Sequence, residues 1–112
     1  MTNVSIVRDS EGFIWEFTVE GHAGSSKKGE NDIVCAAISA ITFTAVNALE
    51  ELAGIKSCSM EEGRIKCSIP ADISAQLKPC VKIILDTIAI GFKQIEYTPS
   101  YRKYISILDE EV

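Results

Sequence analysis

The sequence predicts an α+β domain in which a mostly antiparallel sheet packs with two helices, in the order ββαββαβ. Alternating apolar and polar residues, typical of strands, occur in four segments. These segments are residues 4–8, 13–20, 56–70 and 101–107, of which 56–70 is long enough for a hairpin of two strands. Two other segments have apolar residues at three- and four-residue steps, which is typical of helices. Since a chain of 112 residues suits one domain, we expect a single domain over residues 1–112.

The first hairpin is predicted by the turn sequence Asp-Ser-Glu-Gly at residues 9–12, which separates two alternating segments. The second of these segments has two distinct faces, with Phe13, Trp15, Phe17 and Val19 on one and Ile14, Glu16, Thr18 and Glu20 on the other. Residues 21–31 hold three glycines and two serines, so we expect a flexible loop after the hairpin.

The first helix is expected to begin with Asp32 as its N-cap and to end with Gly54 as its C-cap. Residues 33–49 contain no charged side chain, and apolar residues cover most of the helix surface. A helix of this kind is buried on several sides. We therefore expect the sheet to cover one face and the second helix, or a second subunit, to cover another.

The second half of the chain predicts another hairpin, with its turn at residues 61–63, and then the second helix. Pro79 falls inside the helical pattern, so either the helix kinks there or its long part starts near Lys78. A final strand is expected to begin at Tyr101. The acidic residues 109–111 after this strand are expected to form a solvated tail.

Charge and composition narrow the class of partner. The formal net charge is −5, with a pI near 4.8. Nucleic-acid binding requires clustered Lys and Arg, so we expect no nucleic-acid partner and favour a basic one. The N-terminal segment lacks the features of a signal peptide, and no apolar run without polar interruption is long enough for a membrane span. We therefore expect a cytoplasmic protein that has no membrane partner.

The four cysteines, Cys35, Cys58, Cys67 and Cys80, contain no CxxC pair. They are too sparse for a disulfide scaffold and wrongly spaced for a structural zinc site, so we expect neither a metal nor a cofactor. In a reducing cytoplasm all four are expected to be free thiols. We interpret Cys58, Cys67 and Cys80 as packing residues.

His22 is the only histidine, and Cys35 follows it by thirteen residues. The intervening glycine-rich loop allows the two side chains to meet, and Cys35 is expected in the first turn of the first helix. A thiol is more reactive at a helix N-terminus and beside an imidazole, and free amide N–H groups there can hold an oxyanion. This favours a catalytic Cys–His dyad. The alternative is a loop histidine and a small core cysteine.

Two neighbours are candidate supporting residues. Ser39 lies four residues after Cys35 and so shares its helix face. Its hydroxyl can bond a substrate or, alternatively, a carbonyl of its own helix. Asp32 can orient His22 or, alternatively, act only as the N-cap, and these two roles compete.

The segment from residue 21 to residue 40 reads Gly-His-Ala, a short glycine-containing loop, then Asp-Ile-Val-Cys-Ala with a serine four residues after the cysteine. This pattern resembles the ribosomal-processing cysteine protease family, called Prp. The similarity extends over nearly the whole chain and includes Tyr-Thr-Pro-Ser-Tyr at residues 97–101.

The resemblance implies a cysteine endopeptidase with His22 and Cys35 as its catalytic residues and Asp32 and Ser39 in support. Its substrate would be an extended precursor of large-subunit ribosomal protein number twenty-seven, whose short N-terminal extension is removed after a phenylalanine. The resemblance also implies a homodimer with a mobile loop over the site. Here that loop would be residues 23–31, with its glycines at Gly24 and Gly29.

A second function remains open from the residues alone. A non-catalytic, dimeric binding partner of ribosomal proteins, or a ribosome assembly factor, would need no reactive thiol. The acidic charge suits either reading, because ribosomal proteins are strongly basic.

Overall fold

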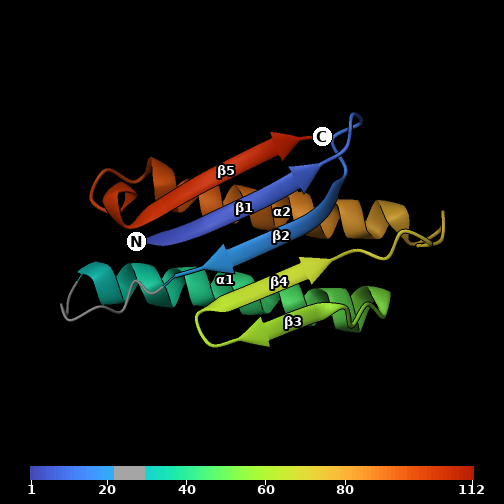
Figure 1. Cartoon of the computed structure of the whole chain (residues 1–112), viewed down its shortest axis with the longest axis horizontal. Helices are drawn as coiled ribbons and strands as arrows, with labels where there is room; N and C mark the ends of the chain where they lie inside the picture. The colour runs from blue at the N-terminus through green and yellow to red at the C-terminus, as the bar shows by residue number, and fades with distance from the viewer. Residues whose placement is uncertain (22–29) are drawn as a thin grey trace.

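The computed structural model describes residues 1–21 and 30–112, with the backbone alone for residues 30–32. The strands are β1 (Thr2–Arg8), β2 (Ile14–Glu20), β3 (Cys58–Glu61), β4 (Arg64–Ser68) and β5 (Ile105–Glu111). The helices are α1 (Glu30–Ala53), α2 (Lys78–Tyr97) and the short 3₁₀ helix η1 (Arg102–Tyr104). The strands and the two α-helices follow the predicted order ββαββαβ (Figure 1).

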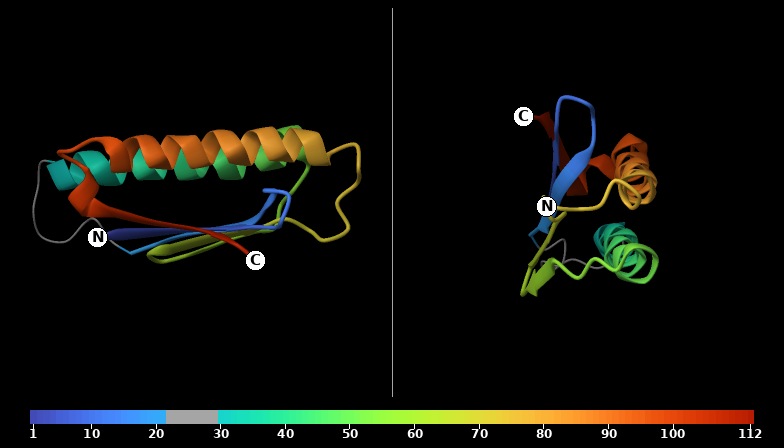
Figure 2. Two further views of the ribbon diagram at one scale, coloured as in Figure 1. Left: turned by 90° about the horizontal axis from the view of Figure 1, so that it is seen from above. Right: turned by 90° about the vertical axis from the view of Figure 1, so that its right-hand side faces the viewer.

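The five strands form one sheet in the order β3-β4-β2-β1-β5. All neighbours are antiparallel except β1 and β5, which pair in parallel. In the described part of the chain both α-helices lie on the same face of the sheet, side by side (Figure 2). The predicted class, a mostly antiparallel α+β domain, is confirmed.

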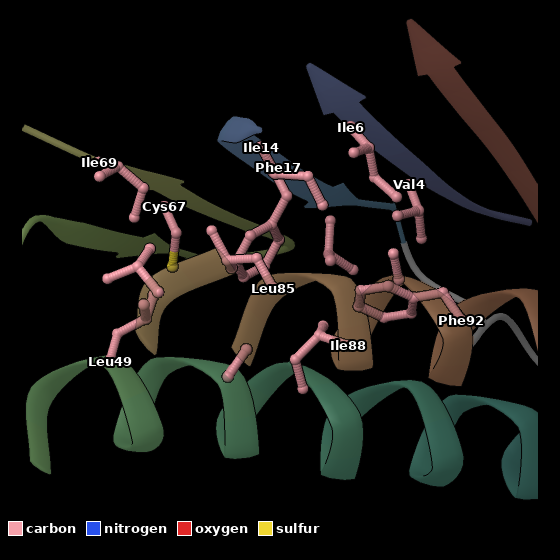
Figure 3. Close-up of a cluster of buried hydrophobic side chains, with 14 of the residues drawn as sticks. Val4, Ile6, Ile14, Phe17, Leu49, Cys67, Ile69, Leu85, Ile88 and Phe92 are labelled. Carbon is pink, nitrogen blue, oxygen red and sulfur yellow. The ribbon is translucent and has the colours of Figure 1, made fainter. Parts of the chain in front are cut away.

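The core lies between the sheet and this helical layer (Figure 3). Alternation in the strands directs every second side chain toward the helices. The core residues include Val4, Ile6, Phe17 and Cys67 from the sheet, Val34, Ile38, Ala45 and Leu49 from α1, and Val81, Leu85, Ile88 and Phe92 from α2. Each large apolar side chain buried here contributes about 1.5–3 kcal/mol relative to leaving it exposed.

The predicted turn after β1 is confirmed, and Asp9 organises it. The Asp9 carboxylate accepts hydrogen bonds from the backbone N–H groups of Glu11 and Phe13 and from Nε1 of Trp15. These bonds, that from Trp15 first among them, lower the pKa of Asp9. The strict alternation predicted for β2 is wrong at its start. Val7 of β1 pairs with Glu16, but the next residue, Arg8, pairs with Ile14, so the register shifts there. The shift buries Ile14, which the sequence pattern placed on the polar face.

The helix ends agree only in part with the prediction. Gly54 is the C-cap: its φ is +67°, and the N–H groups of Gly54 and Ile55 bond back into the last turn. Pro79 is the second residue of α2, so the helix starts at Lys78 rather than kinking. However, α1 begins at Glu30, which places Asp32 within its first turn instead of at the N-cap.

The C-terminal segment differs most from the prediction. Tyr101 precedes the 3₁₀ turn η1 instead of opening a strand, and the strand begins only at Ile105. Residues 109–111 are exposed, as expected, but they are part of β5 and not a tail. Asp109 accepts hydrogen bonds from Arg8 and Lys93, and the Arg8 bond holds its pKa below the usual value. The acidic run is thus ordered by β1 and α2, which are distant in sequence.

The expectation of four free thiols is wrong, because Cys58 and Cys67 are joined in a disulfide. These residues are directly opposite one another on β3 and β4, with their Cα atoms 4.1 Å apart. The pairing depends on the register of the hairpin, which the spacing of nine residues does not reveal. Cys35 and Cys80 are free. Cys67 does pack in the core, as expected.

By length and composition, the stretch of α1 from Ile33 to Ala53 is also apolar enough to cross a membrane. In this fold one side of α1 packs against the sheet, and another lies against α2. At that contact Gly91 faces Ile41, and a Cβ at position 91 would lie 3.3 Å from Cδ1 of Ile41. Only 28% of the stretch is buried, so the prediction of a helix buried on several sides is confirmed for these two sides alone.

Candidate active site

Cys35 lies on α1, half-buried, at a cavity of about 300 Å³ between this helix and the sheet. Ser39 and Phe43 line the same cavity. The three residues are four apart, so they occupy one face of the helix in successive turns. The predicted proximity of Cys35 and Ser39 is therefore confirmed.

The opposite wall comes from the ends of several strands. It combines the start of β1, the end of β2 and the turn of the β3–β4 hairpin. The lining residues on this side are Thr2, Val19, Gly21, Met60, Glu61, Gly63, Arg64 and Ile65. The cavity thus has both apolar walls and charged residues, a combination typical of ligand-binding sites.

Gly21 directly follows β2, lines the cavity and has little conformational freedom. Its N–H donates a hydrogen bond to the carbonyl oxygen of Gly63 in the hairpin turn, at 2.9 Å. Its φ is +103°, and a Cβ at this position would lie only 2.7 Å from the carbonyl oxygen of Met1. Only glycine fits this conformation without strain. Gly21 is also the residue directly before His22, and it lines the same cavity as Cys35.

Several predicted site residues lie outside the described residues. These are His22 and the loop glycines Gly24 and Gly29; the side chain of Asp32 is not described either. Glu30 and Asn31, which we expected in the loop of residues 23–31, belong to α1. The roles of these residues stay predictions.

The position of Cys35 differs from the one expected. Because α1 starts at Glu30, Cys35 is its sixth residue and belongs to the second turn instead of the first. Within α1 the backbone N–H groups without an intrahelical acceptor are those of residues 30–32. Any oxyanion donors supplied by the helix therefore lie one turn before the thiol, and the N–H of Cys35 itself is not one of them.

Phe43, Met60 and Gly63 also line the site, although the sequence reasoning missed them. Phe43 could have been found, because it continues the four-residue spacing from Cys35 through Ser39. Met60 and Gly63 could not, because their approach to the cavity depends on the pairing of β4 with β2.

Solved structures of the same fold are similar to this chain over nearly its whole length. SMU.848 from Streptococcus mutans is 27% identical, covering 100% of this chain and 96% of its own, with a TM-score of 0.84. An essential ribosomal processing protease Prp from S. aureus, in complex with a substrate peptide, is 25% identical, covering 98% of this chain and 100% of its own, with a TM-score of 0.81. A further structure of the S. aureus protease, with a covalently linked product peptide, has a TM-score of 0.75, 25% identity, and coverage of 98% of this chain and 100% of its own.

The fold, these likenesses and the match to a family of cysteine proteases define the protein as a cysteine protease, with Cys35 as a free thiol at the cavity. The model of the family described as cysteine protease Prp matches residues 1–106, so the chain belongs to this family. The ribosomal processing cysteine protease Prp of Bacillus subtilis (strain 168) is 26% identical over 99 residues, which are 86% of this chain and 88% of that protein. The resemblance stated from the sequence is confirmed.

Proposed function

We propose that this cysteine protease is an endopeptidase that removes the N-terminal extension of large-subunit ribosomal protein number twenty-seven, cutting after a phenylalanine. Cys35 is the nucleophile, and His22 is its general base and acid. One observation carries the assignment: Cys35, a free thiol, and Gly21, the residue before His22, line the same cavity. The relatives from S. aureus, described with substrate and covalently linked product peptides, support it.

The proposed reaction has two covalent steps. His22 takes the proton from Sγ of Cys35, and the sulfur adds to the scissile carbonyl carbon to give a tetrahedral oxyanion. The carbon–nitrogen bond then breaks, and His22 gives the proton to the departing amine. A water molecule, deprotonated by His22, then attacks the thioester carbon to give a second tetrahedral intermediate. The carbon–sulfur bond of this intermediate breaks, which releases the carboxylic acid, and His22 returns the proton to the Cys35 sulfur.

Elements of the helix start would assist this chemistry. The N–H groups of residues 30–32 have no intrahelical acceptor and are the candidate donors to the oxyanion. Asp32 would support the imidazole or these N–H groups, and Ser39, one turn beyond Cys35, would bond the substrate backbone. No cofactor or metal takes part in the proposed reaction.

Charge supports a basic substrate. The chain carries a formal net charge of −5, whereas ribosomal proteins are strongly basic. Opposite charges on enzyme and substrate raise the rate of encounter. The negative charge of the chain also disfavours binding to the phosphates of nucleic acid. We accordingly propose a basic protein substrate and, separately, a cytoplasmic location for the enzyme.

We also propose a homodimer joined through the helical layer. On the side away from the sheet, Ile83 and Ile90 of α2 are 67% and 64% exposed. Ile90 lines a groove between α1 and α2 together with Ile41 and Gly91. An exposed apolar face of this kind is typical of an interface between subunits. Ile90→Glu is expected to give monomers in sedimentation equilibrium, whereas Ile83→Glu and Ile90→Glu variants that both remain dimeric would contradict this interface.

The test of the proposed activity is incubation with the extended ribosomal protein, followed by mass spectrometry of the products. We expect one cut, after a phenylalanine near the N-terminus, and no cut by the His22→Ala variant. Cys58→Ala and Cys67→Ala should retain the cut at temperatures where they are folded. An uncut precursor with the wild-type enzyme, or full activity of His22→Ala, would contradict the proposal.

A further inference from the structure

The active-site cavity continues along α1 beyond the residues proposed for catalysis. Phe43 lies two turns after Cys35 on the same helix face and lines the same cavity. Met60, at the end of the β3–β4 hairpin, lines the facing wall. The cavity thus has the candidate nucleophile toward one end of α1 and two large apolar side chains farther along.

These two side chains are exposed although most residues of their kind are buried. Phe43 is 46% exposed and Met60 is 59% exposed. The register explains the position of Met60: it pairs with Ile65, which pairs with Val19. Val19 is buried and Ile65 is partly buried against the core, so Met60 belongs to the same helix-facing row but extends beyond the part that α1 covers.

The spacing along the helix fixes which part of a peptide would reach Phe43. Eight residues of helix advance about 12 Å, at about 1.5 Å for each residue. An extended peptide advances about 3.3 Å for each residue. A substrate that lies along α1 with its scissile carbonyl at Cys35 would therefore bring a side chain three or four residues away to Phe43 and Met60.

We propose that Phe43 and Met60 form a specificity subsite for a large apolar side chain, such as leucine, methionine or phenylalanine, three or four residues from the scissile bond. An aromatic ring and a flexible thioether make an adaptable apolar pocket, and they lose contact with water when such a side chain enters. The subsite deepens the proposed function and rests on it, because it assigns the peptide to the groove that begins at Cys35.

The test measures kcat/KM on two matched sets. The first set is the peptide that spans the cleavage site, with each residue within five positions on either side of the scissile bond replaced by serine in turn. The second set is the enzyme variants Met60→Ser, Phe43→Ser and Met60→Leu. Leu52→Ser is the control, because Leu52 lies on α1, is 64% exposed and does not line the cavity.

For the wild-type enzyme, serine three or four residues from the cut should lower kcat/KM about tenfold, mainly through KM, which is the usual scale for apolar contacts in a pocket. Met60→Ser and Phe43→Ser should show the same loss on the parent peptide and little further loss on the serine peptide, since the two changes remove one contact. Leu52→Ser should behave as wild type, whereas Met60→Leu, which keeps an apolar side chain, should still discriminate against the serine peptide. Circular dichroism melts confirm that each variant is folded at the assay temperature.

The subsite is wrong if folded Met60→Ser and Phe43→Ser enzymes keep the wild-type kcat/KM on the parent peptide. It is also wrong if they still discriminate against the serine peptide as the wild-type enzyme does. In either case the proposed function stands as long as activity depends on Cys35. Loss of that dependence would instead refute the proposed function itself, so the two failures are distinguishable.

Discussion

Replacing Gly21 by alanine tests how firmly the fold holds the residue that precedes the proposed catalytic histidine, His22. The new Cβ would lie 2.7 Å from the carbonyl oxygen of Met1, and the residue would keep a φ of +103°. A backbone conformation of this kind costs about 1–3 kcal/mol for a residue other than glycine. Relieving the contact also strains the hydrogen bond to Gly63, which contributes about 1 kcal/mol. We expect a total loss of about 3 kcal/mol in the free energy of unfolding.

The assay combines thermal unfolding with cleavage. For a domain of this size about 1 kcal/mol corresponds to about 4 °C, so Tm should fall by about 10–15 °C. Well below Tm, kcat/KM should still fall about tenfold, because the clash requires the backbone next to His22 to move by several tenths of an ångström, and displacements of about 1 Å in a site cost about a hundredfold.

Gly12→Ala is the matched control. Gly12 also has a positive φ, +84°, but a Cβ there would meet nothing within 4 Å. It should cost only the backbone strain, about 1–2 kcal/mol, and leave kcat/KM unchanged. The reasoning is refuted if Gly21→Ala melts at the same temperature as Gly12→Ala and cleaves at the wild-type rate.

Three further predictions concern the disulfide, the charge network and the free thiols. Reduction of the Cys58–Cys67 bond should lower stability by about 2.5 kcal/mol, as expected for so short a closed loop, and an unchanged Tm after reduction would contradict this. Asp109→Asn should lower stability at pH 7 by about 1 kcal/mol or less, since the pair with Arg8 is near the surface. Because the Arg8 bond lowers the pKa of Asp109, the stabilisation by this carboxylate is present at neutral pH and is lost below about pH 4. The melting temperatures of the wild type and Asp109→Asn should therefore converge in acid. A constant difference from pH 7 to pH 2 would contradict this prediction. At neutral pH iodoacetamide should alkylate Cys35 faster than Cys80, and equal rates would argue against an activated nucleophile.

The sequence allowed the element order and most turns to be predicted, because these depend on local patterns. Gly54 at the end of α1 follows directly from the conformation that glycine prefers, and of the two alternatives predicted for Pro79 the structure has the helix start. Features that depend on pairing between distant segments were missed. Asp109 looked like a solvated residue because nothing in its neighbourhood indicates the parallel pairing of β5 with β1.

The site shows the same division. The four-residue spacing correctly placed Ser39 beside Cys35, because helix geometry is local. The start of α1 was misplaced by three residues, since Asp32 has the side chain of an N-cap but Glu30 is already the first residue of the helix. The disulfide and the approach of Met60 to the cavity both result from hairpin register, which follows from the sheet as a whole.

The most direct test of the central claim is cleavage of the extended ribosomal protein by Cys35→Ala and Cys80→Ala enzymes, with the products identified by mass spectrometry. Both residues are free, half-buried cysteines on α-helices, but only Cys35 lines the cavity. We predict that Cys35→Ala yields no product and that Cys80→Ala cuts at the wild-type position and rate. Cleavage by folded Cys35→Ala at the wild-type rate would contradict the assignment of Cys35 as the nucleophile.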